Sequence, residues 1–194
     1  MLAPLKKPPL ARGFIHARIM ARALDGGVVD DLLAKMLASR AIGMGALPQD
    51  LGLGRERFLA LLANRFPRLP WILDGSDTDG ARLPEREDLI GLMLRHAADA
   101  STGRRDTAVD MAAIVAAACM GSDHLWEDLG LWSRADLSLL MRHNFPALAA
   151  KNDRDMKWKK FLYKQLCQEE GIHVCRAPSC EVCRDYDLCF GPEN

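Results

Sequence analysis

Four cysteines near the C-terminal end of the chain have the spacing expected of ligands to one metal centre. Cys175, Cys180, Cys183 and Cys189 follow one another as C-x4-C-x2-C-x5-C. Thiolates are soft ligands, and four of them on one short segment can surround a zinc ion or an iron–sulfur cluster. The sequence therefore predicts a cysteine-rich, metal-binding tail over residues 172–194.

The gaps between the cysteines favour one of these two centres. Structural zinc is usually held by two C-x2-C pairs with a longer insert between them, whereas this tail has a single such pair, Cys180 and Cys183. Cluster-binding segments use mixed gaps, because the chain must pass around a wider group. The spacing favours an iron–sulfur cluster of the 3Fe-4S or 4Fe-4S type, with structural zinc as the alternative.

The two remaining cysteines have different expected roles. Cys167 lies eight residues before Cys175, and it is either a fifth thiolate near the centre or a small residue on the inner face of a helix. Cys119 stands in the apolar segment AAACM and is expected in the core. A disulfide framework is not expected, because the chain shows no export signal and the cytosol keeps thiols reduced.

Length, charge and hydropathy limit the class of protein. The 194 residues suffice for one domain with a hydrophobic core, and 26 basic residues balance 26 acidic ones. No overall charge therefore draws the chain to nucleic acid or to a membrane surface. The N-terminal residues lack the apolar core of a signal peptide, and the longest apolar run, at 112–120, is shorter than a membrane span. We expect a soluble, cytoplasmic protein.

Helical periodicity dominates the chain, and no alternating run of β-branched residues appears, so the expected fold is all-α. We expect a flexible lead-in over residues 1–13, a single bundle-like helical domain over 14–171, and the irregular cysteine tail beyond it. The expected helices cover about 14–23, 28–41, 54–65, 84–100, 108–120, 135–144 and 153–171, with a short helical turn within 123–132.

Short polar side chains that can accept backbone N–H groups stand at the start of three of these helices. The expected capping residues are Asp30 or Asp31, Thr107 with Asp110, and Ser133 with Asp136.

The segment MKWKKFLYKQ mixes lysines with aromatic residues, as some proteins that bind single-stranded nucleic acid do. Helical spacing argues instead for an amphipathic helix. The stripe expected to face the core is Trp158, Phe161, Leu162, Gln165 and Leu166. The lysines on a different face are Lys157, Lys160 and Lys164. We interpret these lysines as a positive surface that attracts an oxyanion or docks a partner, or else as an ordinary solvated face.

Two weaker metal-binding candidates are rejected. In the calcium-like stretch DGSDTDG, aligning Gly80 with the invariant glycine places Gly75 and Arg86 at ligand positions, and neither side chain can ligate calcium. His124 is interpreted as a hydrogen-bonded packing residue rather than a ligand. His173, two residues before Cys175, is nearer the tail but belongs to no recognised ligand pattern.

Three segments together resemble one known family. DHLWEDLGL, NDRDMKWKKFLYKQLC and the cysteine tail ending in CFGPEN are similar to NifQ, a nitrogen-fixation protein of molybdenum supply. The resemblance is strongest over residues 109–194. It implies an iron–sulfur protein that takes up molybdenum from molybdate for the iron–molybdenum cofactor of nitrogenase. The family's cysteine motif, which holds a molybdenum–iron–sulfur cluster, falls on Cys175, Cys180, Cys183 and Cys189.

The partners that the resemblance implies are the cofactor scaffold complex and the nitrogenase iron protein. The leading hypothesis is a metal carrier that is not an enzyme, because no phosphate loop, nucleophile elbow or HExxH motif occurs. The alternatives are a helical interaction module with a structural zinc tail, and a redox enzyme that uses a four-iron cluster.

Overall fold

The computed structural model describes residues 9–69, 84–98 and 105–169. Throughout these ranges the chain forms helices joined by turns, with no strand, so the expected all-α class is confirmed. None of the helices in these ranges is long and apolar enough to cross a membrane. The DGSDTDG stretch and the cysteine tail lie outside the described residues.

The helices are numbered in chain order. They are α1 (Pro9–Met20), α2 (Val28–Ala41), α3 (Arg55–Arg65), α4 (Pro84–Arg95), α5 (Arg105–Cys119), α6 (Leu125–Asp128), α7 (Arg134–Asn144), α8 (Pro146–Lys151) and α9 (Trp158–Glu169).

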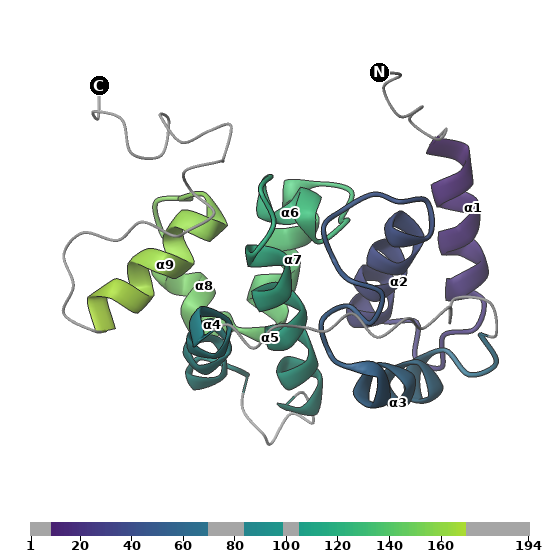
Figure 1. Ribbon diagram of the computed structural model, residues 1–194, viewed down its shortest axis with the longest axis horizontal. Coiled ribbons are helices and arrows are strands. Elements are labelled where there is room, and N and C mark those ends of the chain that lie inside the picture. Colours follow the sequence, from purple (N-terminus) through teal and green to yellow (C-terminus); the bar gives the residue numbers. More distant parts are fainter. Residues whose placement is uncertain (1–8, 70–83, 99–104, 170–194) are drawn as a thin grey trace.

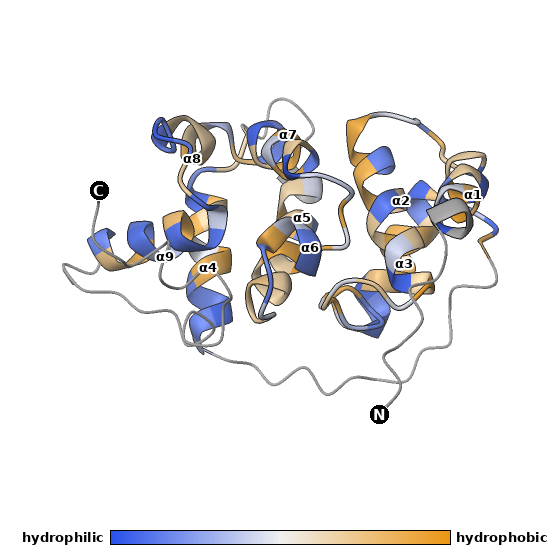
Figure 2. Cartoon of the chain, turned by 90° about the horizontal axis from the view of Figure 1, so that it is seen from above, coloured by the Kyte–Doolittle hydropathy of each residue, from blue (hydrophilic) through white to orange (hydrophobic). Residues whose placement is uncertain are grey.

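These helices lie in three groups along the long axis of the molecule (Figure 1). One end contains α1, α2 and α3, the middle contains α5, α6 and α7, and the other end contains α4, α8 and α9. Figure 2, turned by 90°, shows the same grouping. The middle group joins the two ends, because α2 packs on α7 at one side while α4 packs on α5 at the other.

The central helix α5 is apolar on nearly every side, which suits a helix surrounded by others. Its fully buried side chains include Met111, Ile114, Val115 and Cys119. Burying an aliphatic side chain of this size stabilises the fold by about 1.5–3 kcal/mol. The expectation that Cys119 belongs to the core is confirmed.

Two helix ends differ from the sequence-based expectation. The helix predicted over about 14–23 begins earlier, at Pro9, and ends at Met20. Proline suits the first turn of a helix, where its missing N–H costs no hydrogen bond. The helix predicted to reach residue 100 ends at Arg95, and the N–H of Ala98 instead donates to the carbonyl of Asn144 at 3.0 Å.

The segment before the last helix was also predicted incorrectly. It contains α8, which the periodicity did not predict, and α9 begins at Trp158 rather than at residue 153. The amide of Asn152 closes the intervening turn, since its Oδ1 accepts from Met156 N–H at 2.9 Å and its Nδ2 donates to Met156 O at 3.1 Å. Asp155 has φ 49°, a left-handed conformation that cannot continue an α-helix.

Of the three predicted caps, the one at Ser133 is confirmed. Its Oγ accepts the N–H of Asp136 at 3.1 Å and so begins α7. Thr107 is not a cap, because it lies within α5. Its Oγ1 accepts from Arg65 Nη2 of α3 at 2.7 Å.

The cap predicted for α2 was wrong as well. Gly27 occupies that position, and Asp30 and Asp31 lie in the first turn of the helix. Asp30 is buried, and its two oxygens accept from Gly26 N–H and from Arg65 Nη1, both at 2.9 Å. Arg65 thereby joins α2, α3 and α5 through one guanidinium.

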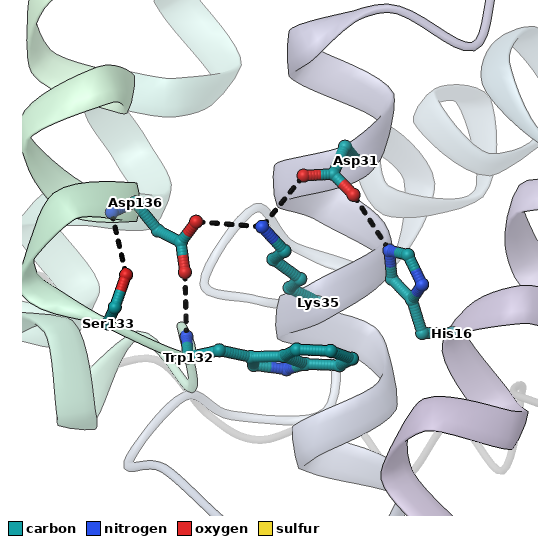
Figure 3. A network of polar contacts seen from close by, with 6 residues as sticks. All are labelled: His16, Asp31, Lys35, Trp132, Ser133 and Asp136. Atoms are coloured by element: carbon teal, nitrogen blue, oxygen red, sulfur yellow. Dashed lines mark hydrogen bonds and ion pairs between the residues drawn. The ribbon is translucent and has the colours of Figure 1, made fainter.

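A chain of polar contacts joins α1, α2 and α7 (Figure 3). Lys35 Nζ donates to Asp31 Oδ2 at 2.8 Å and to Asp136 Oδ1 at 2.7 Å. The other oxygen of Asp31 lies 2.9 Å from His16 Nε2, and the other oxygen of Asp136 accepts from Trp132 N–H at 3.2 Å. Lys35 thus forms an ionic link between α2 and α7.

The charged side chains of this polar network stabilise one another. Burial by itself raises the pKa of Asp31, but hydrogen bonds from Lys35 and His16 outweigh burial and lower that pKa below its usual 3.8. A carboxyl with a lowered folded-state pKa contributes stability above its unfolded-state pKa. The contribution is lost as the pH falls from about 4 through the lowered value.

We expect Lys35→Met to reduce the free energy of unfolding by about 1–2 kcal/mol at pH 7, because two carboxylates lose a shared donor. The Lys35 side chain is only 16% exposed, so solvent compensates poorly. Urea denaturation followed by circular dichroism measures the loss, which should shrink as Asp31 becomes protonated. The matched control is Lys164→Met, at an exposed position of α9, with an expected loss below about 0.5 kcal/mol. Equal losses in the two variants would contradict the assigned role.

Candidate metal centre

The four predicted ligands, Cys175, Cys180, Cys183 and Cys189, lie outside the described residues. In the helical body as described, no group of three or more His, Cys, Asp or Glu side chains could hold a metal ion. The described residues show the helix from which the tail departs, α9, and the side chains that surround its C-terminal end.

The helix α9 packs through the apolar stripe that its sequence predicts. Its buried residues include Trp158, Phe161, Leu162 and Leu166. Gln165 was wrongly placed in this stripe, since it is only half-buried and its Nε2 donates to Gln168 Oε1 at 2.8 Å. Tyr163, which the prediction left out, is buried.

Two polar contacts join α9 to α4. The hydroxyl of Tyr163 donates to the carboxylate of Glu85 at the start of α4. Two turns later, Glu169 pairs with Arg95 at the end of α4. The second contact holds the last turn of α9 to the end of α4.

Cys167 lies near this end of α9 and is 8% exposed. It follows Tyr163 by four residues, so both side chains project from the same face of the helix. This burial agrees with the interpretation of Cys167 as an inner-face residue. Its role as a fifth thiolate stays a prediction.

The predicted positive surface is only partly exposed. Lys164 is exposed, whereas Lys160 and Lys157 are half-buried, and Lys157 lies just before the first residue of α9. The attraction of an oxyanion or a partner by these lysines stays a prediction.

A fourth lysine of the same segment, Lys159, has a structural role that the sequence did not reveal. Its Nζ donates to Asp128 Oδ2 at 2.5 Å and to the carbonyl of Gly121 at 2.8 Å. The two charged side chains are 13% and 3% exposed. Burial raises the pKa of Asp128, and the nearby ammonium of Lys159 opposes that rise. This pair holds the start of α9 against α6 and the end of α5.

His96, just beyond the last residue of α4, joins α4 to α8 through a contact that sequence reasoning missed. Its Nδ1 lies 3.0 Å from the carbonyl oxygen of Leu92, and its Nε2 lies 2.7 Å from Lys151 Nζ. A carbonyl oxygen only accepts and an ammonium only donates, so Nδ1 carries the proton and Nε2 is the acceptor. No motif surrounds His96, and its contact with Lys151 of α8 arises only from tertiary packing.

His124 stands at the start of α6. Its backbone N–H donates to Glu127 Oε2 at 3.3 Å, which supports the first turn of this short helix. It belongs to no metal-ligating group within the described ranges. The interpretation of its side chain as a packing residue stays a prediction.

Comparison with known proteins gives the family. A family model described as NifQ matches residues 32–191, a range that includes all four cysteines of the predicted centre. The chain is 42% identical to Protein NifQ of Azotobacter vinelandii over 174 residues, which are 83% of this chain and 87% of the relative.

Two further relatives have the same name. The chain is 40% identical to Protein NifQ of Rhodobacter capsulatus over 165 residues, covering 84% of this chain and 87% of the relative. It is 34% identical to Protein NifQ of Klebsiella pneumoniae over 169 residues, covering 82% and 97%. No solved structure matches the chain significantly. The chain belongs to the NifQ family, a family of nitrogen-fixation accessory proteins implicated in molybdenum processing.

Proposed function

We propose that this protein is an iron–sulfur molybdenum carrier. It captures molybdenum from molybdate and donates it to synthesis of the iron–molybdenum cofactor of nitrogenase. The observation that carries the proposal is the NifQ match through residue 191, which takes in the whole C-x4-C-x2-C-x5-C pattern. The family indicates the metal, and the cysteines provide ligands suited to a cluster.

In this proposal the tail cysteines would hold an iron–sulfur cluster. The cluster would supply sulfide ligands for the molybdenum cargo at an accessible position. Soft sulfur ligands and an accessible position suit capture followed by release. No residue of the chain acts as a catalytic group in this scheme.

The helical body holds α9, the helix that precedes the tail, in place. Lys159 fixes the start of α9 through Asp128, while Tyr163 and Glu169 fix its later turns against α4. We propose that the lysines before and within α9 attract molybdate. We also propose that the same surface docks the cofactor scaffold complex and the nitrogenase iron protein. The residues of this surface are Lys157, Lys160 and Lys164. We place the protein in the cytoplasm, where thiols stay reduced.

Purification without oxygen, followed by a visible spectrum and metal analysis, tests the proposal. The expected result is a coloured protein that contains iron and sulfide and retains molybdenum after incubation with molybdate. A colourless protein with one zinc per chain would overturn the proposal and favour the alternative, a helical interaction module with a structural zinc tail. Transfer of retained molybdenum to the purified scaffold complex tests the donor role.

A further inference from the structure

We propose that the outer face of α1 docks an acidic amphipathic helix of a partner protein. This face consists of Phe14, Ala17, Ala21 and the following Leu24. It lies far from α9, since α1 and α9 stand at opposite ends of the long axis of the molecule (Figure 1). It also lies outside the family match, which begins at residue 32 within α2. The inference is therefore independent of the proposed metal centre.

The inner face of α1 is already covered by the helical body. Ile19 is fully buried. The Nε2 atom of His16 lies 2.9 Å from Asp31 Oδ1 of α2. The guanidinium carbon of Arg12 lies 4.6 Å from the centre of the Trp132 ring. These contacts fix α1 on the body, so its opposite face is held outward.

The outer face carries an apolar stripe that the described part of the chain leaves exposed. Phe14, Ala17 and Ala21 are separated by three and four residues, which places them on one side of the helix. The turn after α1 has backbone hydrogen bonds between residues three apart, at 2.9 and 3.0 Å. In such a tight turn residues three apart eclipse, so Leu24 extends the stripe from Ala21. Phe14 is 64% exposed and Leu24 is 69% exposed. Large apolar side chains exposed together are typical of a surface that binds another protein.

Basic side chains border this stripe. The guanidinium carbon of Arg18 lies 5.7 Å from the centre of the Phe14 ring, so a positive charge stands beside the apolar side chains. Arg22 is exposed, and its Nη1 donates to Arg68 O at 2.6 Å, which brings a third exposed arginine close to it. Asp25 offsets only one of these charges. The charges therefore favour a partner that has carboxylates beside its apolar positions.

The size and charge of the face argue for a single helix rather than a second copy of this chain. Three helical turns are about 16 Å long and about 10 Å wide, or roughly 160 Å². A stable dimer usually buries about 800 Å² on each partner. A second copy would also bring the same arginines against Arg18 and Arg22. A membrane surface is less suitable, because the alanines between Phe14 and Leu24 bury little apolar area. An amphipathic helix of opposite charge can place its apolar anchors along the stripe.

Binding of synthetic helical peptides to the full chain tests the inference. One peptide has leucine at heptad positions a and d with glutamate on both flanks, and the second has lysine in place of each glutamate. Fluorescence anisotropy should show that the acidic peptide binds at least about tenfold more tightly than the basic one. Phe14→Ser with Leu24→Ser should weaken binding of the acidic peptide by about tenfold or more. Arg18→Glu with Arg22→Glu should reverse the preference between the two peptides.

The matched control is Leu139→Ser, which removes another exposed leucine, on α7, and should leave binding unchanged. Circular dichroism checks that every variant keeps its helical signal. Absence of peptide binding, equal affinity for the two peptides, or unchanged binding in Phe14→Ser with Leu24→Ser would overturn the inference. A wild-type dimer in sedimentation velocity that these two substitutions dissociate would assign the face to a second copy and overturn it too. Binding to phosphatidylserine vesicles without discrimination between the peptides would assign the face to a membrane, with the same consequence.

Discussion

Replacing Cys180 with alanine is expected to bring the iron and molybdenum retained by the protein to background level, with the helical circular dichroism signal largely unchanged. Structural zinc sites of four protein ligands bind with about 10–16 kcal/mol in total, so by analogy one thiolate ligand is worth roughly 3 kcal/mol, or about a hundredfold in affinity. The helical signal should persist, because the apolar core of the described residues is built from side chains that precede the tail. Metal analysis after anaerobic gel filtration measures the change.

Cys119→Ala is the matched control for this experiment. Cys119 is fully buried, and burial raises the pKa of its thiol to about 12, so it is protonated at neutral pH and cannot ligate. The control should keep its metal and lose about 1 kcal/mol of stability through the small cavity it creates. Full metal retention in Cys180→Ala would refute the proposed centre, and so would equal metal loss in the control.

Lys159→Met is expected to reduce the free energy of unfolding by about 3 kcal/mol at pH 7, the largest stability change that we predict. The substitution leaves the Asp128 carboxylate 3% exposed and without its ammonium. Removing one member of a buried ion pair typically costs about 3–5 kcal/mol, because the remaining charge stays desolvated. Urea denaturation measures this loss, and a loss below about 1 kcal/mol would contradict the prediction.

The loss should depend on pH in a defined direction. Burial already raises the pKa of Asp128 in the folded protein, and removing Lys159 takes away the charge that opposes the rise. A carboxyl whose folded-state pKa exceeds its unfolded-state value of about 3.8 costs stability as the pH rises through that interval. The deficit of Lys159→Met should therefore be complete at pH 7 and smaller at pH 5.

The double variant Lys159→Met with Asp128→Asn separates charge from packing. It removes both charges, so it should recover at least about 1–2 kcal/mol relative to the sum of the two single variants. It should also lose the pH dependence. Additive losses would show that Lys159 acts through its methylene stem rather than through its charge.

The helical class could be predicted because it depends on local periodicity. The apolar pattern of α5 predicted a central helix, and the stripe on α9 predicted four of its buried residues. Ser133 could be recognised as a cap because its partner is only three residues away. Thr107 has the same kind of pattern, yet its hydroxyl accepts from Arg65, which lies 42 residues away. A capping pattern cannot indicate such a distant partner.

The lysines before and within α9 also show that a local pattern does not indicate a distant partner. Lys159 and Lys160 are adjacent and chemically equivalent in the sequence. Only the packing of α9 against α6 shows that Lys159 belongs to a buried ion pair. The sequence also cannot indicate that Lys151 reaches His96, since 55 residues separate them.

The sequence by itself determined the all-α class, the cysteine spacing and, through its similarity to known relatives, the family. These properties depend on residue types at short and regular separations. The tertiary structure alone decided which lysine is buried with Asp128, which glutamate pairs with Arg95, and which lysine reaches His96. Such pairings depend on how helices distant in the sequence pack together, and no local pattern records that packing.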